Sequence, residues 1–130
     1  MIDFETARRL KELGFDFKSG KAWITDSSGV EVISYPELED NENEEKFFIP
    51  SVTELIKTLP PFINVHDRYY KLVISLHVTG EKPDKHIYAR YEMNMGYGKT
   101  PASLCGFPSD QCLEEQLANL LIYIKEHGWI

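Results

Sequence analysis

One stretch of the chain, residues 69–92, constrains the fold more than any other. In Tyr69–Val78 the apolar side chains alternate with the others, which is the period of two expected of a strand with one buried face. Lys85–Met93 repeats the alternation, and Gly80 and Pro83 between the two runs are typical of a turn. The stretch therefore predicts an antiparallel hairpin.

The register of this hairpin follows from the requirement that both apolar faces be the same face. A slip of one residue would turn one strand inside out. The pairs that meet the requirement are Leu72 with Tyr91, Ile74 with Ala89, Leu76 with Ile87 and, on the other face, Lys71 with Glu92 and His77 with His86. A shift of two residues would keep the faces and make the two histidines diagonal neighbours.

Length and charge limit the class of protein. The chain has 130 residues, which is the length of one domain, and no domain boundary is expected within 1–130. Its 14 basic and 21 acidic residues give a net charge of −7, which argues against a nucleic-acid-binding surface. No apolar run is long enough to span a bilayer and the N-terminus does not resemble a signal peptide, so we expect a cytoplasmic protein without membrane contact. Cys105 and Cys112 lack metal-binding spacing, and we expect them to be reduced and structural.

Local patterns predict further elements on either side of the hairpin. Residues 3–13 have the spacing of a short helix that ends at Gly14, and its outer face offers the pairs Glu5 with Arg9 and Arg8 with Glu12. Residues 22–34 read as a second hairpin, in which Trp23 packs in the core or at the sheet edge.

Two more helices follow from capping and periodicity. Ser51 and Glu54 form the S-x-x-E capping box, and the helix that it opens buries Val52, Leu55, Ile56 and Leu59 before Pro60 ends it. Residues 111–127 have helical apolar spacing behind Ser109 or Asp110, either of which is a good N-cap. The expected fold is therefore α+β: one antiparallel sheet, with hairpins at about 22–34 and 69–92, packed by a long C-terminal helix and a short capped helix.

Two segments are predicted to lack regular structure. Residues 37–46 concentrate acidic side chains and read as a mobile loop. A calcium site is the alternative there, although the spacing of an EF-hand is absent. Residues 93–110 are rich in Gly, Pro and Ser and read as a long irregular connection. Within them Gly96–Thr100 resembles a phosphate-binding loop, but Met93 stands where that motif needs Gly, so a turn with an exposed Lys99 is the favoured interpretation.

The candidate site residues fall into two groups. His77 and His86, opposite each other on one sheet face, form a candidate metal pair, although two ligands do not complete a structural zinc site and two surface histidines are the alternative. Tyr69, Tyr88, Tyr97 and Lys99 are candidate binding residues, because aromatic side chains on the second face of the hairpin indicate that this face is covered. The first hairpin is favoured as that cover over a second subunit. No catalytic residues and no cofactor are expected, since no nucleophile has a recognisable base partner.

The order of elements resembles small uncharacterised α+β proteins of bacterial genomes and prophages. The resemblance is carried by Pro50–Ile56, by Tyr88–Glu92 and by Leu117–Ile124 with the ending Gly128–Ile130. It implies no activity and transfers no functional residues. The favoured hypothesis is a non-enzymatic binding or accessory protein that acts through protein–protein interaction or self-association. The alternative is a small-molecule or metal-binding enzyme that uses the 93–110 loop and the histidine pair.

Overall fold

The computed structural model describes residues 2–17, 20–26, 29–34, 45–79, 84–96, 98, 99, 102–106 and 111–130, and leaves out the side chains at 26, 32–34, 77–79, 84 and 85. Its elements follow in the order α1 (Phe4–Glu12), β1 (Lys21–Asp26), β2 (Gly29–Ser34), β3 (Glu45–Phe48), α2 (Val52–Thr58), β4 (Phe62–Val65), β5 (Arg68–Thr79), β6 (Asp84–Met93), β7 (Ala102–Gly106) and α3 (Leu113–Glu126). The predicted α+β class is confirmed, and both predicted hairpins are present.

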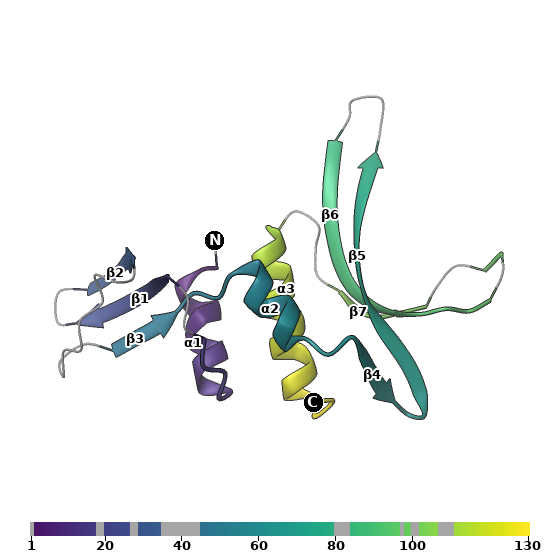
Figure 1. The fold of residues 1–130 in the computed structure, drawn as a ribbon, viewed down its shortest axis with the longest axis horizontal. Coiled ribbons are helices and arrows are strands. Elements are labelled where there is room, and N and C mark those ends of the chain that lie inside the picture. The colour runs from purple at the N-terminus through teal and green to yellow at the C-terminus, as the bar shows by residue number, and fades with distance from the viewer. Residues whose placement is uncertain are drawn as a thin grey trace.

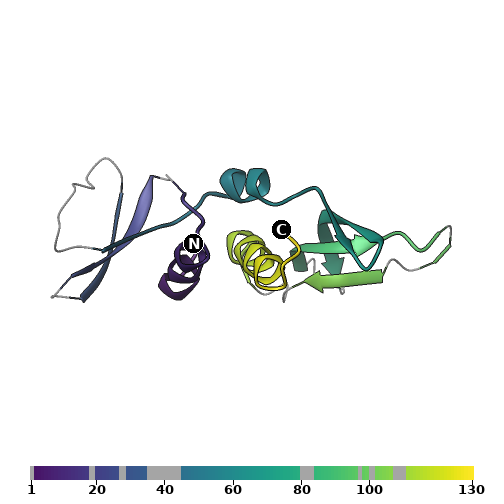
Figure 2. The same ribbon diagram turned by 90° about the horizontal axis from the view of Figure 1, so that it is seen from below.

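The two hairpins lie in separate antiparallel sheets, whereas the sequence predicted a single sheet. One sheet has the order β2-β1-β3 and the other β4-β5-β6-β7. Figures 1 and 2 show the three helices between the two sheets. Each hairpin is extended by a further strand that the sequence analysis did not identify. β3 pairs with β1 in one sheet, and β4 pairs with β5 in the other.

The register of the β5–β6 hairpin is confirmed residue by residue. Leu72 pairs with Tyr91, Ile74 with Ala89, Leu76 with Ile87, Lys71 with Glu92 and His77 with His86. On the other side of β6, the pairing with β7 shifts between Tyr91 and Glu92, so Leu104 is an extra residue on β7. Such a bulge bends a strand, and Figure 1 shows β5 and β6 curving strongly along their length.

α1 lies within the predicted residues 3–13 and α2 begins at its predicted cap, but the predicted cap of α3 is wrong. The Asp3 side chain accepts a hydrogen bond from Thr6 N–H at 2.8 Å, and Gly14 follows α1 with φ +89°. In α2 both bonds of the capping box form, at 3.1 and 3.2 Å. The N-cap of α3 is Cys112, which makes no side-chain cap, so the prediction of Ser109 or Asp110 is wrong.

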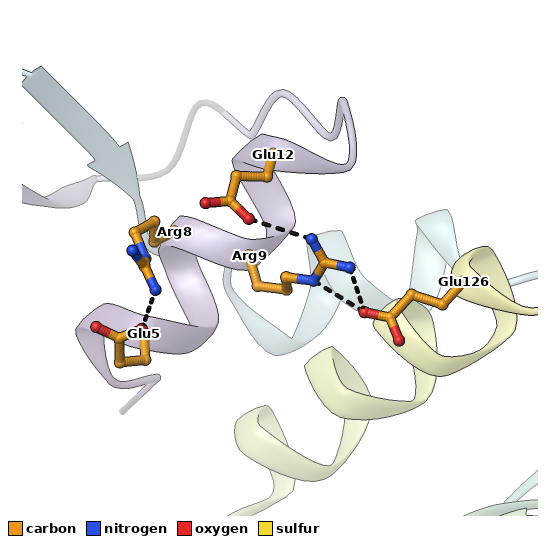
Figure 3. Close-up of polar contacts among 5 residues, drawn as sticks. All are labelled: Glu5, Arg8, Arg9, Glu12 and Glu126. Carbon is orange, nitrogen blue, oxygen red and sulfur yellow. Dashed lines mark hydrogen bonds and ion pairs between the residues drawn. The ribbon is translucent and has the colours of Figure 1, made fainter.

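α1 and α3 run in the same direction and are joined at both ends. At the first end the Glu115 carboxylate accepts hydrogen bonds from Asp3 N–H at 2.6 Å and from the Thr6 hydroxyl at 3.1 Å. At the other end Arg9 pairs with Glu126 at 2.7 Å (Figure 3).

The ion pairs predicted within α1 are wrong in their partners. Arg8 pairs with Glu5 and Arg9 with Glu12, each at i,i+3, in place of the predicted i,i+4 pairs (Figure 3). Arg9 turns toward Glu126 of the neighbouring helix, which a pattern within one helix does not reveal.

One continuous core joins the helices to both sheets. Leu10, Leu55, Leu117 and Leu121 of the helices are fully buried together with Tyr91 of β6. On the side of the first sheet, Phe4 meets Trp23 and Phe47 edge to face.

Two further predictions concern the packing of single side chains. Trp23 packs as expected, and its ring N–H donates to the Ile2 carbonyl at 3.1 Å. Ile56 is 42% exposed, so its predicted burial is wrong.

The predicted acidic loop is shorter than expected at its end. β3 begins at Glu45 and includes Lys46, while the rest of residues 37–46, with the calcium alternative, lies outside the described residues. In the described part of the chain, no helix has the length and apolar character needed to cross a membrane.

Candidate protein-binding surface

The helices cover one face of the four-stranded sheet only in part, because Ile74, Leu76 and Ile87 on that face stay exposed. No described element covers the other face. The covered face carries Ile63, Ala89 and Tyr91, all buried. By the strand register, the opposite face carries Phe62, Asn64, Tyr69, Lys71, Val73, Ser75, Tyr88, Arg90 and Glu92, and we call these residues the open sheet face. The prediction that the first hairpin covers this face is wrong, because β1 and β2 lie on the far side of the helices (Figure 1).

Arg90 is the centre of the open sheet face. Its Nε donates to Glu92 Oε2 at 2.7 Å, and its Nη1 donates to Ser75 Oγ at 2.7 Å. Its guanidinium lies 5.2 Å from the centre of the Tyr88 ring, within the range of a cation–π contact. The Arg90 and Glu92 side chains are only 16% and 13% exposed. The arginine is therefore held in one orientation before any partner arrives.

Two exposed aromatic side chains stand at one end of the same face. Phe62 is 60% exposed and Tyr69 is 67% exposed. Phe62 pairs with Lys71 and Tyr69 with Asn64, which makes the two aromatic residues diagonal neighbours on adjacent strands. The open sheet face therefore carries both exposed aromatic surface and a fixed arginine.

The turn between β4 and β5 sets the register of Phe62 and Tyr69. His66 and Asp67 both have positive φ, at 51° and 63°, which is the conformation of a tight type I′ hairpin turn. His66 thus lies in a turn between two strands, and the sequence analysis missed β4.

Tyr88 lies against Gly106 of β7. A Cβ atom at Gly106 would collide with the Tyr88 hydroxyl and would stand 2.9 Å from Tyr88 Cζ and 3.2 Å from Arg90 Cβ. Glycine at this position therefore makes room for the Tyr88 ring. β7 lies within residues 93–110, so the prediction of an irregular connection is wrong over Ala102–Gly106.

The predicted binding residues are only partly brought together. Tyr69 and Tyr88 lie on the open sheet face, and Tyr97 lies outside the described residues. Lys99 is exposed in the connection between β6 and β7, where its N–H bonds to the Gly96 carbonyl at 3.2 Å. Because strand β7 follows, and not a helix, the phosphate-loop alternative has no helix N-terminus to bind phosphate.

The predicted metal pair has the expected strand register, but the described residues do not complete a metal site. His77 and His86 are Cα partners across β5 and β6, and the side chain of His77 lies outside the description. Among the described residues no group of three or more His, Cys, Asp or Glu side chains is arranged to hold a metal ion.

Cys105 lies on β7 of this sheet, and its surroundings make its thiol unreactive. Burial raises the pKa of the Cys105 thiol to about 11, so it stays protonated at neutral pH. Burial, with a smaller contribution from Cys105, also raises the pKa of the Tyr91 phenol, whose hydroxyl donates to the Pro60 carbonyl at 2.7 Å. Both groups are structural.

A shallow depression of about 390 Å³ lies apart from this sheet, between α1 and β3, and is lined by Arg8, Lys11, Glu12, Glu45 and Phe47. Lys11 already donates to the Lys46 carbonyl at 3.0 Å and lies 4.8 Å from the Phe47 ring centre. Its cationic group is engaged within the chain, so the depression offers little to a ligand.

Sequence reasoning missed Arg90 and Phe62. The alternation Tyr88, Arg90, Glu92 on the second face of β6 was the available signal for Arg90, since residues two apart on a strand share a face. For Phe62 the signal was Phe62–Val65 followed by His66-Asp67, because His, Asn and Asp are enriched at positive φ.

No protein-family model matches the chain, and no significant match was found among curated proteins or solved structures. The resemblance to prophage-encoded proteins therefore stays a prediction.

Proposed function

We propose that this chain is a non-enzymatic binding protein that docks a protein partner on the open sheet face. The observation that carries the proposal is the exposure of Phe62 and Tyr69 on the same sheet face as the fixed guanidinium of Arg90. Tyrosine and arginine are enriched among the residues that dominate binding energy at protein interfaces. Exposed aromatic side chains on a strand also lose little conformational freedom when a partner covers them.

The fixed orientation of Arg90 supports binding over catalysis. Glu92 and Ser75 hold the guanidinium in place, so a partner need not order it, and pre-organised groups contribute more to affinity than mobile ones. The pairing with Glu92 also offsets its charge, which makes the site a poor fit for a phosphate group. A partner with apolar side chains and backbone acceptors matches this surface better than a nucleic acid does.

The test is quantitative capture from a lysate of the source cells, with the purified chain as bait. Phe62→Ala, Tyr69→Ala and Tyr88→Ala each change the open sheet face, and Val30→Ala is the matched control, because Val30 is 51% exposed on the other sheet. We expect the captured amount of at least one protein to fall about tenfold or more with the variants of the open sheet face. This fall is equivalent to a loss of ~1.4 kcal/mol of binding free energy. The same protein should be retained by Val30→Ala. Identical captured sets from all four variants would contradict the proposal.

The confirmed register keeps metal binding as a second candidate function, because it sets His77 opposite His86. Native mass spectrometry of untagged protein tests it directly. A bound metal that is lost from His86→Ala and retained by His127→Ala would support this function, because His127 is an exposed histidine at the C-terminal end of α3. A metal-free mass for the native protein would remove it.

A further inference from the structure

The outer half of β5 is an open sheet edge. β4 pairs only with Arg68–Lys71, and the last bond on that side joins Leu72 N–H to the Pro61 carbonyl. Because backbone groups alternate between the two edges of a strand, those of Ile74, Leu76 and Val78 point the same way as those of Leu72. No other described strand pairs with them. Figure 1 shows this part of the hairpin extending beyond α3 and β4.

The sequence of this edge lacks the residues that commonly protect an edge strand from pairing. Natural edge strands are shielded by charged side chains, proline or bulges. Residues 72–79 contain no Lys, Arg, Asp, Glu or Pro. Leu76 is 59% exposed, Ile74 is 39% exposed, and Ile87 beside them on β6 is 43% exposed. An uncharged edge with an apolar face is suited to pairing with another strand.

The sequence of the β5 edge is compatible with antiparallel pairing to the same edge of a second copy. In an antiparallel pairing centred on Leu76, Leu76 stands opposite Leu76 of a second copy, and positions 74 and 78, both apolar in the sequence, are paired. The remaining pairs of positions are 75 with 77 and 73 with 79, and in the sequence none of them opposes two like charges. The chain has a net charge of −7, and residues 72–79 contribute no acidic side chain to the repulsion between two copies.

We propose that two copies of this chain associate through antiparallel pairing of their β5 edges, centred on Leu76. The two four-stranded sheets then form one continuous sheet. Because the pairing keeps residues of the same parity on the same side, both open sheet faces point in one direction. A single strand pair buries less than a standard interface of about 1,600 Å², so the dimer dissociates on dilution into the micromolar range.

Sedimentation velocity over a wide concentration range tests the association. Leu76→Lys and Leu76→Glu each place like charges against each other at the centre, and each variant alone should weaken association at least tenfold. An equimolar mixture of the two should associate again, because Lys then faces Glu. Leu76 is more than half exposed, so neither change disturbs the core. A wild-type chain that stays monomeric, or a mixture that associates no better than either variant alone, would overturn the proposal.

Disulfide cross-linking tests the register with a near-native chain. In a background with Cys105→Ala and Cys112→Ser, Leu76→Cys places two thiols at a directly paired position, where Cα atoms stand about 5.5 Å apart and a disulfide fits. Tyr69→Cys is the control, because its two copies would stand roughly 45 Å apart along the strands. Oxidation should give a cross-linked dimer from Leu76→Cys only. Equal cross-linking of both variants, or of neither, contradicts the pairing.

This association is independent of the partner proposed above. The Leu76 variants leave Phe62 and Tyr69 unchanged, and the Tyr69 variants leave the β5 edge unchanged. Loss of self-association with retained partner capture, or the reverse, therefore separates the two proposals.

Discussion

The side chain of Gln116 on α3 takes the place of a strand beside Ala89 on β6. Its Oε1 accepts from Ala89 N–H at 2.9 Å, and its Nε2 donates to the Ile87 carbonyl at 2.7 Å. These backbone groups lie on the β7 side of β6, where the pairing with β7 ends at Arg90 and Gly106. Gln116 is fully buried, and its amide reproduces the donor and acceptor of a peptide group.

Replacement of Gln116 should therefore be costly. Gln116→Leu keeps the side-chain volume but leaves the Ala89 N–H and the Ile87 and Gln111 carbonyls without the amide. We expect the free energy of unfolding to fall by roughly 2–4 kcal/mol. Asn119→Ala is the control, since Asn119 makes one partly buried bond, to Gln111 at 3.2 Å, and should cost about 1 kcal/mol or less. Urea denaturation measures both. Equal losses would mean that the amide does not support the β6 edge.

The contact between Arg9 and Glu126 ties α1 to the end of α3. The hydrogen bond to Glu126, and then the one to Glu12, raises the pKa of Arg9. We expect Arg9→Ala to lower the melting temperature slightly more than Arg8→Ala, because Arg8 pairs with Glu5 of its own helix and, among the described residues, with no other helix. Since both arginines are exposed, the difference should vanish in about 1 M salt. A difference that persists in high salt would point to packing instead.

Stability should fall at alkaline pH because of the buried thiol and phenol. The pKa of Cys105 is raised to about 11 and that of Tyr91 is also raised, so the unfolded chain loses these protons before the folded chain does. The contribution of Cys105 is complete below about pH 8.5 and is lost as the pH rises toward 11, whereas that of Tyr91 begins to be lost only near pH 10; each loss is up to ~1.4 kcal/mol per pH unit. Cys105→Ala should reduce the slope of unfolding free energy between pH 9 and 11. Parallel curves of unfolding free energy against pH for the unchanged chain and Cys105→Ala would show that folding does not change the pKa of the thiol.

Gly106 should be needed for the position of Tyr88. Gly106→Ala drives a methyl group into the Tyr88 ring, and we expect weaker partner capture together with a stability loss of about 1–3 kcal/mol. Gly20→Ala is the control, because nothing lies within 4 Å of its Cβ. Combined with Tyr88→Ala, the Gly106 change should cost little more, since the collision is then gone. Additive stability losses in the double variant would place the strain elsewhere.

The parts of the fold that could be predicted are those in which a local pattern decides the structure. The alternation in β5 and β6 fixes their register, because a slip exposes a whole apolar face, and every predicted pair is found. The capping box at Ser51 fixes the start of α2 in the same way.

The parts that could not be predicted depend on distant partners. β7 lies within a Gly-, Pro- and Ser-rich segment and becomes a strand because β6 offers it an edge. β3 begins among acidic residues because it pairs with β1. The tertiary environment overrides weak strand propensity in both. Ile56 has the right helical spacing for burial and is exposed, because α3 packs beside it on only part of the helix surface.

The candidate site was predictable only through its aromatic residues. Tyr69 and Tyr88 were found from their position on the second face of the hairpin, where a covered surface was expected. Arg90 donates hydrogen bonds to two residues of its own sheet face, Glu92 and Ser75. The strand pattern alone does not show that these two residues hold the guanidinium. The exposure of that face became evident only when the first hairpin was found in the other sheet.

The most direct test of partner docking is site-specific photo-cross-linking in the source cells. A photoreactive amino acid replaces Tyr69 in one variant and Val30 in another, because both side chains are more than half exposed and they lie on different sheets. The account predicts a discrete cross-linked protein from position 69 that is absent from position 30 and is lost when Gly106→Ala is added. No cross-linked protein at position 69, or the same proteins at both positions, would contradict it.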